Sequence, residues 1–188
     1  MNNEQLIYQQ GPERVSTIPG WASKIALEDL VQSIQWKQNK IRVYGKIYDE
    51  PRLTAWFGPA YAYSNIQWSA TPMPIALQTL VDDLQTQCDF MFNAVLCNYY
   101  RDGHDAMGWH SDNEPEMDQA CIASISLGAT RTLKFKERKG NKQFQVELSH
   151  GDLLVMEHMQ TNWLHAIPKR LKVSEPRLNL TFRHIIER

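Results

Sequence analysis

Residues 121–156 read CIASISLGATRTLKFKERKGNKQFQVELSHGDLLVM, a stretch of short apolar and β-branched runs separated by glycine, asparagine and other turn-forming residues. Runs of this kind, bounded by turn signals, predict β-strands. A series of such strands in one half of a chain is typical of a jelly roll, the double-stranded β-helix in which two sheets face each other. The predicted strands lie at 92–100, 121–127, 132–135, 144–148, 153–156, 163–167 and 178–185.

The part of the chain before residue 90 has a different pattern. Apolar residues at helical spacing predict one helix over 23–36 and another over 74–88, and Ser23 and Pro74 are suited to begin them. Between these helices, residues 41–44 and 53–57 predict two strands around a turn. The first 20 residues lack such a pattern, and we expect a loosely ordered arm there.

These segments predict a mainly β protein with N-terminal helices and a helical and hairpin extension to the jelly roll. The extension, residues 1–89, would hold the arm, the helices and the hairpin. Residues 90–188 would form the jelly-roll core, in one structural unit with the extension. A length of 188 residues and a hydrophobic content of 43% are sufficient for a substantial core.

Composition disfavours several classes of protein. The formal net charge is −1, so a nucleic-acid partner must depend on local patches such as the basic segment 131–142, which also fits a solvated hairpin. Cys88, Cys97 and Cys121 form an odd set without Cys-x-x-Cys spacing, which disfavours a disulfide framework or a structural zinc site. No stretch is apolar enough to span a bilayer. We expect a soluble monomer without a membrane partner, cytoplasmic, or nuclear if the source is eukaryotic.

Two His-x-Asp motifs occur, His110-Ser111-Asp112 and His150-Gly151-Asp152. The second lies between two strand-like runs, where Gly and Asp favour a tight turn. The first follows a strand-rich stretch, and alternation along a strand would direct His110 and Asp112 together toward the sandwich interior. The first motif is therefore the better candidate for a metal site.

Such a site needs a third ligand from a later strand. His158 follows the run 153–156 in a predicted loop, whereas His165 lies within the strand-like segment 163–167, which can present it inward. We therefore choose His165. Two histidines and one carboxylate on one face of Fe(II) leave the opposite positions open, as in non-haem iron oxygenases. A zinc hydrolase uses the same residue types and is an alternative.

Polar and apolar residues alternate from Arg177 to Arg183. A strand here would place Leu178, Leu180 and Phe182 on one face and four polar side chains on the other. Two arginines on a buried face require anionic partners, and a planar guanidinium holds a carboxylate through two parallel hydrogen bonds. The cluster therefore predicts a dicarboxylate co-substrate, 2-oxoglutarate. An edge strand with its polar face in water is the alternative.

The metal and arginine motifs belong to an ordered set of segments. Besides His165 and residues 177–183, the set contains NYYRDG (98–103), GWHSDNEP (108–115), SISLGATR (124–131) and HGDLLVM (150–156). In order and spacing, from about residue 44 to 183, it resembles the AlkB family of nucleic-acid dealkylating dioxygenases. The segment PRLTAWFG (51–58) is further similar to the eukaryotic-type AlkB homologues that repair DNA, and RNA in one branch.

The resemblance implies one set of residues for Fe(II) and another for 2-oxoglutarate. The HGD segment at 150–152 then falls at a structural turn rather than at the metal. The implied ligands are His110, Asp112 and His165 for Fe(II), and Asn98, Tyr100, Arg177, Asn179, Thr181 and Arg183 for 2-oxoglutarate.

Aromatic substrate contacts are also implied by the resemblance. Tyr44 lies in a segment similar to the hairpin with which some members invade a duplex, where it would wedge into the base stack. A surface aromatic without this role fits Tyr44 equally well. Trp56 and Phe57 fall where the family's substrate-recognition lid supplies side chains that stack on a flipped base.

Polar substrate contacts follow from the same resemblance. Glu114 falls at an acidic position facing the alkylated base, and a carboxylate suits a cationic methylated adenine or cytosine. Asn113 stands where the family often has Asp, which would weaken recognition of that positive charge. Arg131 would either contact the substrate or hold the lid.

The implied activity is oxidative demethylation of 1-methyladenine and 3-methylcytosine in DNA, with RNA as a further substrate. O2 and 2-oxoglutarate would be consumed, and succinate, CO2 and formaldehyde released. Three alternatives stay open: the same chemistry on tRNA or a protein side chain, a non-catalytic nucleic-acid reader, and the zinc hydrolase, which leaves the arginine strand without a purpose.

Overall fold

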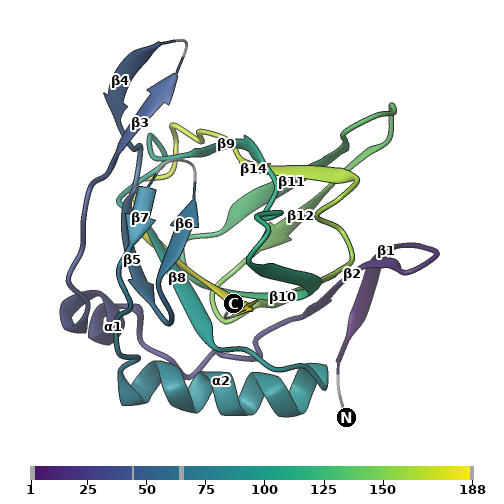
Figure 1. The fold of residues 1–188 in the computed structure, drawn as a ribbon, viewed down its shortest axis with the longest axis horizontal. Helices are drawn as coiled ribbons and strands as arrows, with labels where there is room; N and C mark the ends of the chain where they lie inside the picture. The colour runs from purple at the N-terminus through teal and green to yellow at the C-terminus, as the bar shows by residue number, and fades with distance from the viewer. Residues whose placement is uncertain (1–2, 44, 64–65, 187–188) are drawn as a thin grey trace.

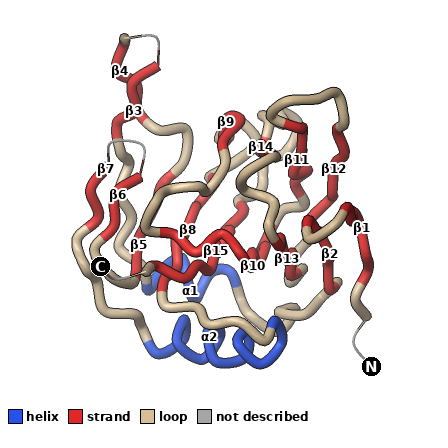
Figure 2. The backbone as a smooth tube through the Cα atoms, turned by 45° about the vertical axis from the view of Figure 1, so that its right-hand side comes forward, coloured by secondary structure: helices blue, strands red, loops and turns tan. Residues whose placement is uncertain are grey.

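The computed structural model of this chain describes residues 3–43, 45–63 and 66–186. Two β-sheets face each other at its centre, and helices cover the outer side of one sheet (Figures 1 and 2). This arrangement confirms the mainly β jelly roll with N-terminal helices that the sequence predicts.

The larger sheet joins strands from both halves of the chain. Its neighbouring strands are antiparallel, and the two longest strands are adjacent near its middle. Within the described residues its order is β1 (Gln5–Gln10), β2 (Glu13–Ile18), β13 (Leu153–Glu157), β10 (Met117–Gly128), β15 (Arg177–Ile185), β8 (Ala94–Tyr100) and β5 (Leu53–Phe57).

The smaller sheet lies opposite and closes the sandwich. Apolar side chains from both sheets fill the space between them, including Leu96 and Ile122 from the larger sheet and Phe135 and Trp163 from the smaller one. Polar side chains on these inner faces are therefore removed from bulk water. In the described part of the chain, the order is β12 (Gln143–Leu148), β11 (Arg131–Glu137), β14 (Trp163–Ile167) and β9 (Met107–His110).

Helices α1 (Leu27–Ser33) and α2 (Ile75–Cys88) cover the outer face of the larger sheet (Figure 2). Leu80 and Leu84 of α2 share a buried cluster with Leu180 and Phe182 of β15. The expected helix at 74–88 is confirmed, but α1 is shorter than the expected 23–36. The residues before it form a turn instead, in which the backbone N–H of Ser23 donates to the Gly20 carbonyl and that of Ile25 to the Ala22 carbonyl, both at 3.1 Å.

The prediction of a loosely ordered arm at the N-terminus is wrong for residues 5–18. β2 pairs with β13 along its length, and Val15 is 0% exposed. The larger sheet thus takes β1, β2 and β5 from before residue 90.

The two strands expected around one turn do not pair with each other. β3 (Lys40–Val43) pairs with β4 (Lys46–Asp49) in a hairpin that projects from the body of the molecule, whereas β5 pairs with β8 (Figure 1). A second short hairpin, β6 (Tyr61–Tyr63) and β7 (Ile66–Trp68), follows β5. Both hairpins lie on the same side of the sandwich as β9 (Figure 1).

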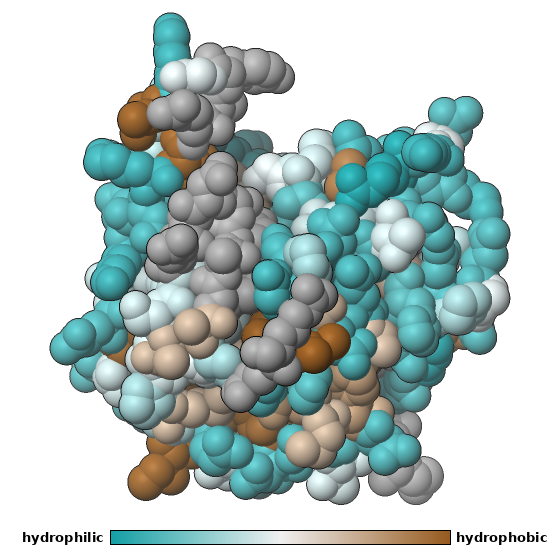
Figure 3. All heavy atoms as spheres, viewed as in Figure 1, coloured by the Kyte–Doolittle hydropathy of each residue, from teal (hydrophilic) through white to brown (hydrophobic). Residues whose placement is uncertain are grey.

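The hairpin β11–β12 carries most of the basic segment 131–142. Its surface is hydrophilic in Figure 3, and Lys134, Arg138, Lys139 and Lys142 are exposed. Neither helix in the described ranges has the length and apolar character needed to cross a membrane.

Candidate active site

The polar face of β15 points into the sandwich. Leu178, Leu180 and Phe182 are fully buried on the helix side, and the four side chains that alternate with them line an interior cavity together with residues of β8, β10 and β14. This is the arrangement predicted from the alternation. The cavity-lining side chains of β15 are Arg177, Asn179, Thr181 and Arg183.

His110, Asp112 and His165 converge at one end of this cavity. One potential ligand atom from each lies within 4.8 Å of the other two. His110 and His165 are directly paired across β9 and β14, with ring centroids 4.2 Å apart. His158 is exposed in a turn, and His150 and Asp152 form the predicted tight turn, in which Gly151 has φ +82°.

Asp112 reaches the site in a different way from the one expected. β9 ends at His110, so strand alternation does not place the carboxylate. The backbone N–H of Asp112 donates to Gln160 Oε1 at 3.0 Å, and Oδ1 lies 2.8 Å from Arg183 Nη2 in a buried ion pair. Asp112 therefore lies in a loop that Gln160 and Arg183 hold in place, rather than in the expected strand.

The electrostatics of this cluster suit a metal ion. Burial lowers the pKa of His110 and lowers that of His165 to about 3, so both imidazoles are neutral near pH 7. Burial alone would raise the pKa of Asp112, but the nearby charge of Arg183 holds it below its ordinary value. Neutral imidazole and ionised carboxylate are the forms that bind metals, and this donor set fits Fe(II).

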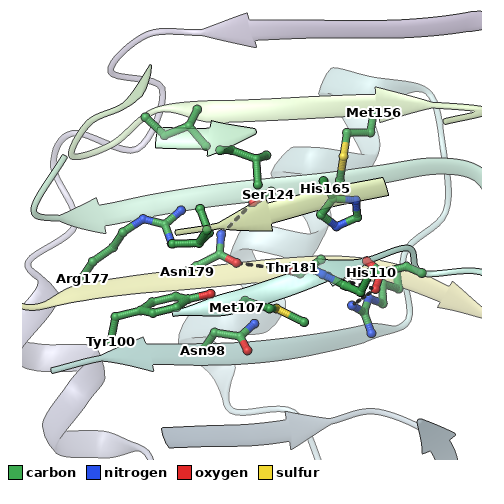
Figure 4. A pocket seen from close by; sticks show the side chains of 15 residues that line it. Asn98, Tyr100, Met107, His110, Ser124, Met156, His165, Arg177, Asn179 and Thr181 are labelled. Carbon is green, nitrogen blue, oxygen red and sulfur yellow. Dashed lines mark hydrogen bonds and ion pairs between the residues drawn. The ribbon is translucent and has the colours of Figure 1, made fainter. Parts of the chain in front are cut away.

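Arg177 lies at the other end of the cavity (Figure 4). Its Nη2 donates to Ser126 Oγ at 2.8 Å, but Nε and Nη1 are buried and have no hydrogen-bond partner among the described residues. Burial lowers the pKa of Arg177 to about 10, which leaves the guanidinium charged at neutral pH. A buried cation with two unused donors requires an anion, and a carboxylate fits it.

Asn98 and Tyr100 project from β8 between these two ends (Figure 4). Two guanidinium groups lie close to the Tyr100 ring, with Arg177 Cζ 5.3 Å and Arg131 Cζ 5.6 Å from its centroid. The cavity therefore runs from a carboxylate-binding end, past an amide and a phenol, to a metal-binding end. These residue types and this order fit 2-oxoglutarate, whose 2-oxo acid end can chelate a metal.

The other two β15 residues are largely satisfied by the protein. Asn179 Nδ2 donates to Ser124 Oγ at 2.7 Å, and Thr181 Oγ donates to Asn179 Oδ1 at 3.0 Å. Arg183 forms the ion pair with Asp112 rather than matching Arg177 at the far end. The two arginines thus have different surroundings, which the sequence pattern does not distinguish.

The candidate substrate residues differ in where their side chains lie. Trp56 and Phe57 are adjacent on β5 and therefore face opposite sides. Trp56 lies on the interior side, with Nε1 bonded to the Pro59 carbonyl at 2.8 Å, whereas Phe57 packs against the helix-side cluster. Phe57 thus faces away from the cavity, and stacking of a base on Phe57 stays a prediction. Tyr44 lies outside the described residues.

The loop after Asp112 carries the other two candidates. Asn113 is exposed, and Glu114 is half-buried, with its carbonyl accepting from the backbone N–H of Met117 at 3.0 Å. Their position beside the metal-binding cluster is compatible with contact to a substrate that approaches this end of the cavity.

Arg131 is buried in the interior rather than exposed at the surface. It is 1% exposed, and its guanidinium donates to the backbone carbonyls of Asp102, Asp105 and Pro168 at 2.8–3.2 Å. Together these bonds tie two loops to β11, as expected if Arg131 holds neighbouring segments in place, and a contact of Arg131 with substrate stays a prediction.

Sequence reasoning missed Arg52, Ser126 and Gln160. The serine could have been found, because Ser124 and Ser126 alternate with apolar residues in β10 and pair with the polar face of β15. Gln160 has no such periodic signal, since it lies in the loop before β14. Arg52 precedes β5, and its Nε donates to Asn98 Oδ1. This contact joins two segments that are far apart in the sequence, so no local pattern indicates it.

Comparisons with known proteins agree with this geometry. A family model described as the 2OG-Fe(II) oxygenase superfamily matches residues 15–183. Alpha-ketoglutarate-dependent dioxygenase alkB homolog 3 of Mus musculus is 38% identical over an alignment of 193 residues, gaps included, that covers 93% of this chain and 67% of the relative. DNA oxidative demethylase ALKBH2 of Homo sapiens is 36% identical over 173 residues, covering 85% of this chain and 66% of the relative.

A solved structure described as "The structure of OsALKBH1" has the same fold. Its TM-score is 0.66 at 16% sequence identity, over 96% of this chain and 100% of that chain. The fold, the site and the sequence relatives all support the same family assignment. The chain belongs to the 2OG-Fe(II) oxygenase superfamily and, within it, to the AlkB family of dioxygenases, which use Fe(II), 2-oxoglutarate and O2.

Proposed function

We propose that this protein removes N-methyl groups oxidatively from alkylated bases in nucleic acid. The observation that carries the proposal is the buried cavity with a His-Asp-His cluster at one end and the open donors of Arg177 at the other. One relative is named as a DNA oxidative demethylase and another as an alkB homolog, which supports nucleic acid as the substrate class.

His110, Asp112 and His165 would hold Fe(II) in this proposal, and Arg177 would pair with the distal carboxylate of 2-oxoglutarate. Asn98 and Tyr100 would hydrogen-bond the co-substrate along its length. Arg183 would act at the metal end, where it neutralises Asp112 and adds positive charge beside the 2-oxo acid group. Asn179 and Thr181 would line the cavity and keep its polar wall rigid.

When bound at these residues, iron and 2-oxoglutarate would supply the oxidation itself, with O2 as oxidant and succinate and CO2 as products. The protein binds and orients the reactants. Its apolar residues, among them Met107, Leu133 and Ile167, line the cavity beside the histidines and limit access of water. A hydroxylated N-methyl group then leaves the base as formaldehyde.

The substrates proposed are 1-methyladenine and 3-methylcytosine in DNA, with RNA as a further substrate. Both bases carry a positive charge when methylated, so a half-buried carboxylate at Glu114 near the metal end favours them. Asn113, Trp56 and Tyr44 would make the remaining contacts. Monomeric action and a cytoplasmic or nuclear location stay predictions from the sequence.

The test is a substrate panel of methylated single-stranded DNA, duplex DNA, RNA and peptide, with formaldehyde and succinate measured together. Methylated nucleic acid should yield both products in equal amounts, and peptide neither. Peptide as the only productive substrate would contradict the proposal. A non-catalytic reader would bind methylated nucleic acid without forming succinate, and a zinc hydrolase would be active with zinc but inactive with iron.

A further inference from the structure

Asn98 lines the active-site cavity from β8, and a residue from another segment holds its side chain. Nε of Arg52, which lies just before β5, donates a hydrogen bond of 2.8 Å to Asn98 Oδ1. Arg52 is 5% exposed and Asn98 is 3% exposed, so water does not compete strongly for this bond. A bond of this type, from a charged donor within a dry interior, fixes the geometry of both partners.

The bond determines which end of the Asn98 amide is available to the cavity. A guanidinium has donors only, so the oxygen of the amide must face Arg52. The Nδ2 group, with two N–H donors, is left for other partners, and it makes no hydrogen bond to the described residues. Every oxygen of 2-oxoglutarate is an acceptor. Arg52 thus leaves the donor end of Asn98 for the co-substrate.

Arg52 is itself held in a buried ion pair. Its Nη2 donates to Glu50 Oε1, and Glu50 is 2% exposed. The backbone of Glu50 is fixed in turn, since its N–H donates to the Asn39 carbonyl at 2.7 Å and its carbonyl accepts from Gln38 Nε2 at 3.0 Å. Arg52 therefore uses two separate donors, one for Glu50 and one for Asn98.

We propose that Arg52, held by Glu50, is a positioning residue that orients the Asn98 amide so that Nδ2 donates to 2-oxoglutarate. The inference rests on the proposed function, because it takes 2-oxoglutarate to be the ligand of Asn98. Without Arg52 the amide can rotate and present its oxygen to the oxygens of the co-substrate. That orientation replaces a hydrogen bond with repulsion.

The experiment is calorimetric titration of 2-oxoglutarate into Mn(II)-loaded protein, without O2 or turnover. Four proteins complete a double-mutant cycle: wild type, Glu50→Gln/Arg52→Gln, Asn98→Ala and the triple variant. Replacing both charges together avoids an unpaired buried ion. Loss of one oriented hydrogen bond to a charged ligand should weaken binding by about tenfold in Glu50→Gln/Arg52→Gln and in Asn98→Ala.

The triple variant separates positioning from a general structural effect. If Arg52 acts through Asn98, the triple variant binds 2-oxoglutarate no more weakly than Asn98→Ala does. The inference is overturned if Glu50→Gln/Arg52→Gln binds like wild type. It is also overturned if the glutamine pair weakens binding by the same factor with and without Asn98, because Arg52 then acts by another route.

A second variant guards against loss of folding. If Glu50→Gln/Arg52→Gln shows no cooperative unfolding, Arg52→Lys takes its place in the cycle. Lysine keeps the charge opposite Glu50 but has one nitrogen in place of the two that serve Glu50 and Asn98. Wild-type protein that fails to bind 2-oxoglutarate overturns the proposed function and this inference together. If wild-type protein binds 2-oxoglutarate and Glu50→Gln/Arg52→Gln binds it equally well, only the role of Arg52 is overturned.

Discussion

Arg177 has two buried donor nitrogens, Nε and Nη1, without an acceptor among the described residues, and this is the most specific residue-scale feature of the cavity. Arg177→Ala removes the charge and both donors. The affinity for 2-oxoglutarate should fall by roughly 10- to 100-fold, the range expected for hydrogen bonds to a charged group. Titration of 2-oxoglutarate into Mn(II)-loaded protein measures this. Arg170→Ala, at a half-exposed arginine beside Glu147, is the matched control and should bind normally.

An unchanged affinity in Arg177→Ala would remove this residue from the co-substrate site. A loss of affinity in both arginine variants would instead indicate a general effect of net charge. Only a selective loss in Arg177→Ala agrees with a carboxylate held at that end of the cavity.

Gly103 is a second residue-scale constraint, and it acts on stability. A Cβ at this position would lie 1.9 Å from the Arg170 carbonyl oxygen, whereas at Gly108 it would meet nothing within 4 Å. The Gly103 N–H also donates to the Val173 carbonyl, and the Gly103 carbonyl accepts from the Arg170 N–H, both at 2.8 Å. Gly103→Ala should therefore lower the free energy of unfolding by about 1–3 kcal/mol, as overpacking does.

Urea unfolding of Gly103→Ala beside Gly108→Ala checks this difference. The control variant should stay within about 0.5 kcal/mol of wild type, because nothing occupies the space that its methyl group enters. Equal stability of the two variants would mean that the loops around Gly103 and Arg170 are not packed as described.

Individual ligands could be predicted from the sequence where a periodic pattern places them. The alternation of Arg177 to Arg183 predicts the inner face of β15, and the position of His165 in a strand-like run predicts its inward direction. Asp112 and Arg52 could not be placed in this way. Asp112 is directed by Gln160 and Arg183, and Arg52 by Glu50, so long-range contacts set both positions.

At the scale of elements, β2 ties the N-terminal segment to the core. Val15 is 0% exposed within the sandwich, whereas Leu6 on β1 is 55% exposed. Val15→Ala should lower the free energy of unfolding by roughly 2 kcal/mol, because two buried methyl groups are lost and a cavity is left in their place. Leu6→Ala should change it by less than about 0.5 kcal/mol.

Chemical unfolding of the two variants measures these changes. A Val15→Ala protein as stable as wild type would restore the loosely ordered arm that the sequence predicts. The sequence could not predict β2 because residues 13–18 are mostly polar and lack a regular alternation. Pairing with β13 makes this segment a strand, and a partner more than 130 residues away leaves no local signal.

The predicted core strands are close to the observed ones for a related reason. β14 agrees with the expected 163–167, and β8, β11, β12, β13 and β15 differ from their expected ranges by no more than two residues at either end. These segments are rich in apolar and β-branched residues because they are buried in the sandwich. β9 is absent from the predicted strands, and β3 was expected to share a turn with β5 rather than with β4. The ends of these strands depend on turns and neighbouring segments rather than on burial.

For the whole molecule, the metal and co-substrate ends of the cavity connect β8, β9, β10, β14 and β15. A ligand that binds only the folded state stabilises it, by about 2.7 kcal/mol at 100 times its dissociation constant. Mn(II) together with 2-oxoglutarate should therefore raise the midpoint of thermal unfolding by several degrees. His165→Ala should abolish the shift, and His158→Ala, at an exposed histidine, should retain it.

Scanning calorimetry of these proteins with and without the two ligands provides the measurement. A shift that persists in His165→Ala would place the metal elsewhere. A shift with Mn(II) alone that 2-oxoglutarate does not increase would separate the metal site from the co-substrate site.

The most direct test of the central claim is mass spectrometry of oligonucleotides that contain 1-methyladenine or 3-methylcytosine, after incubation with the iron-loaded protein. The predicted result is loss of the mass of one methylene group per lesion, dependent on 2-oxoglutarate and O2, and absent from His110→Ala. Oligonucleotides of unchanged mass with the wild-type protein, or full demethylation by His110→Ala, would contradict the claim.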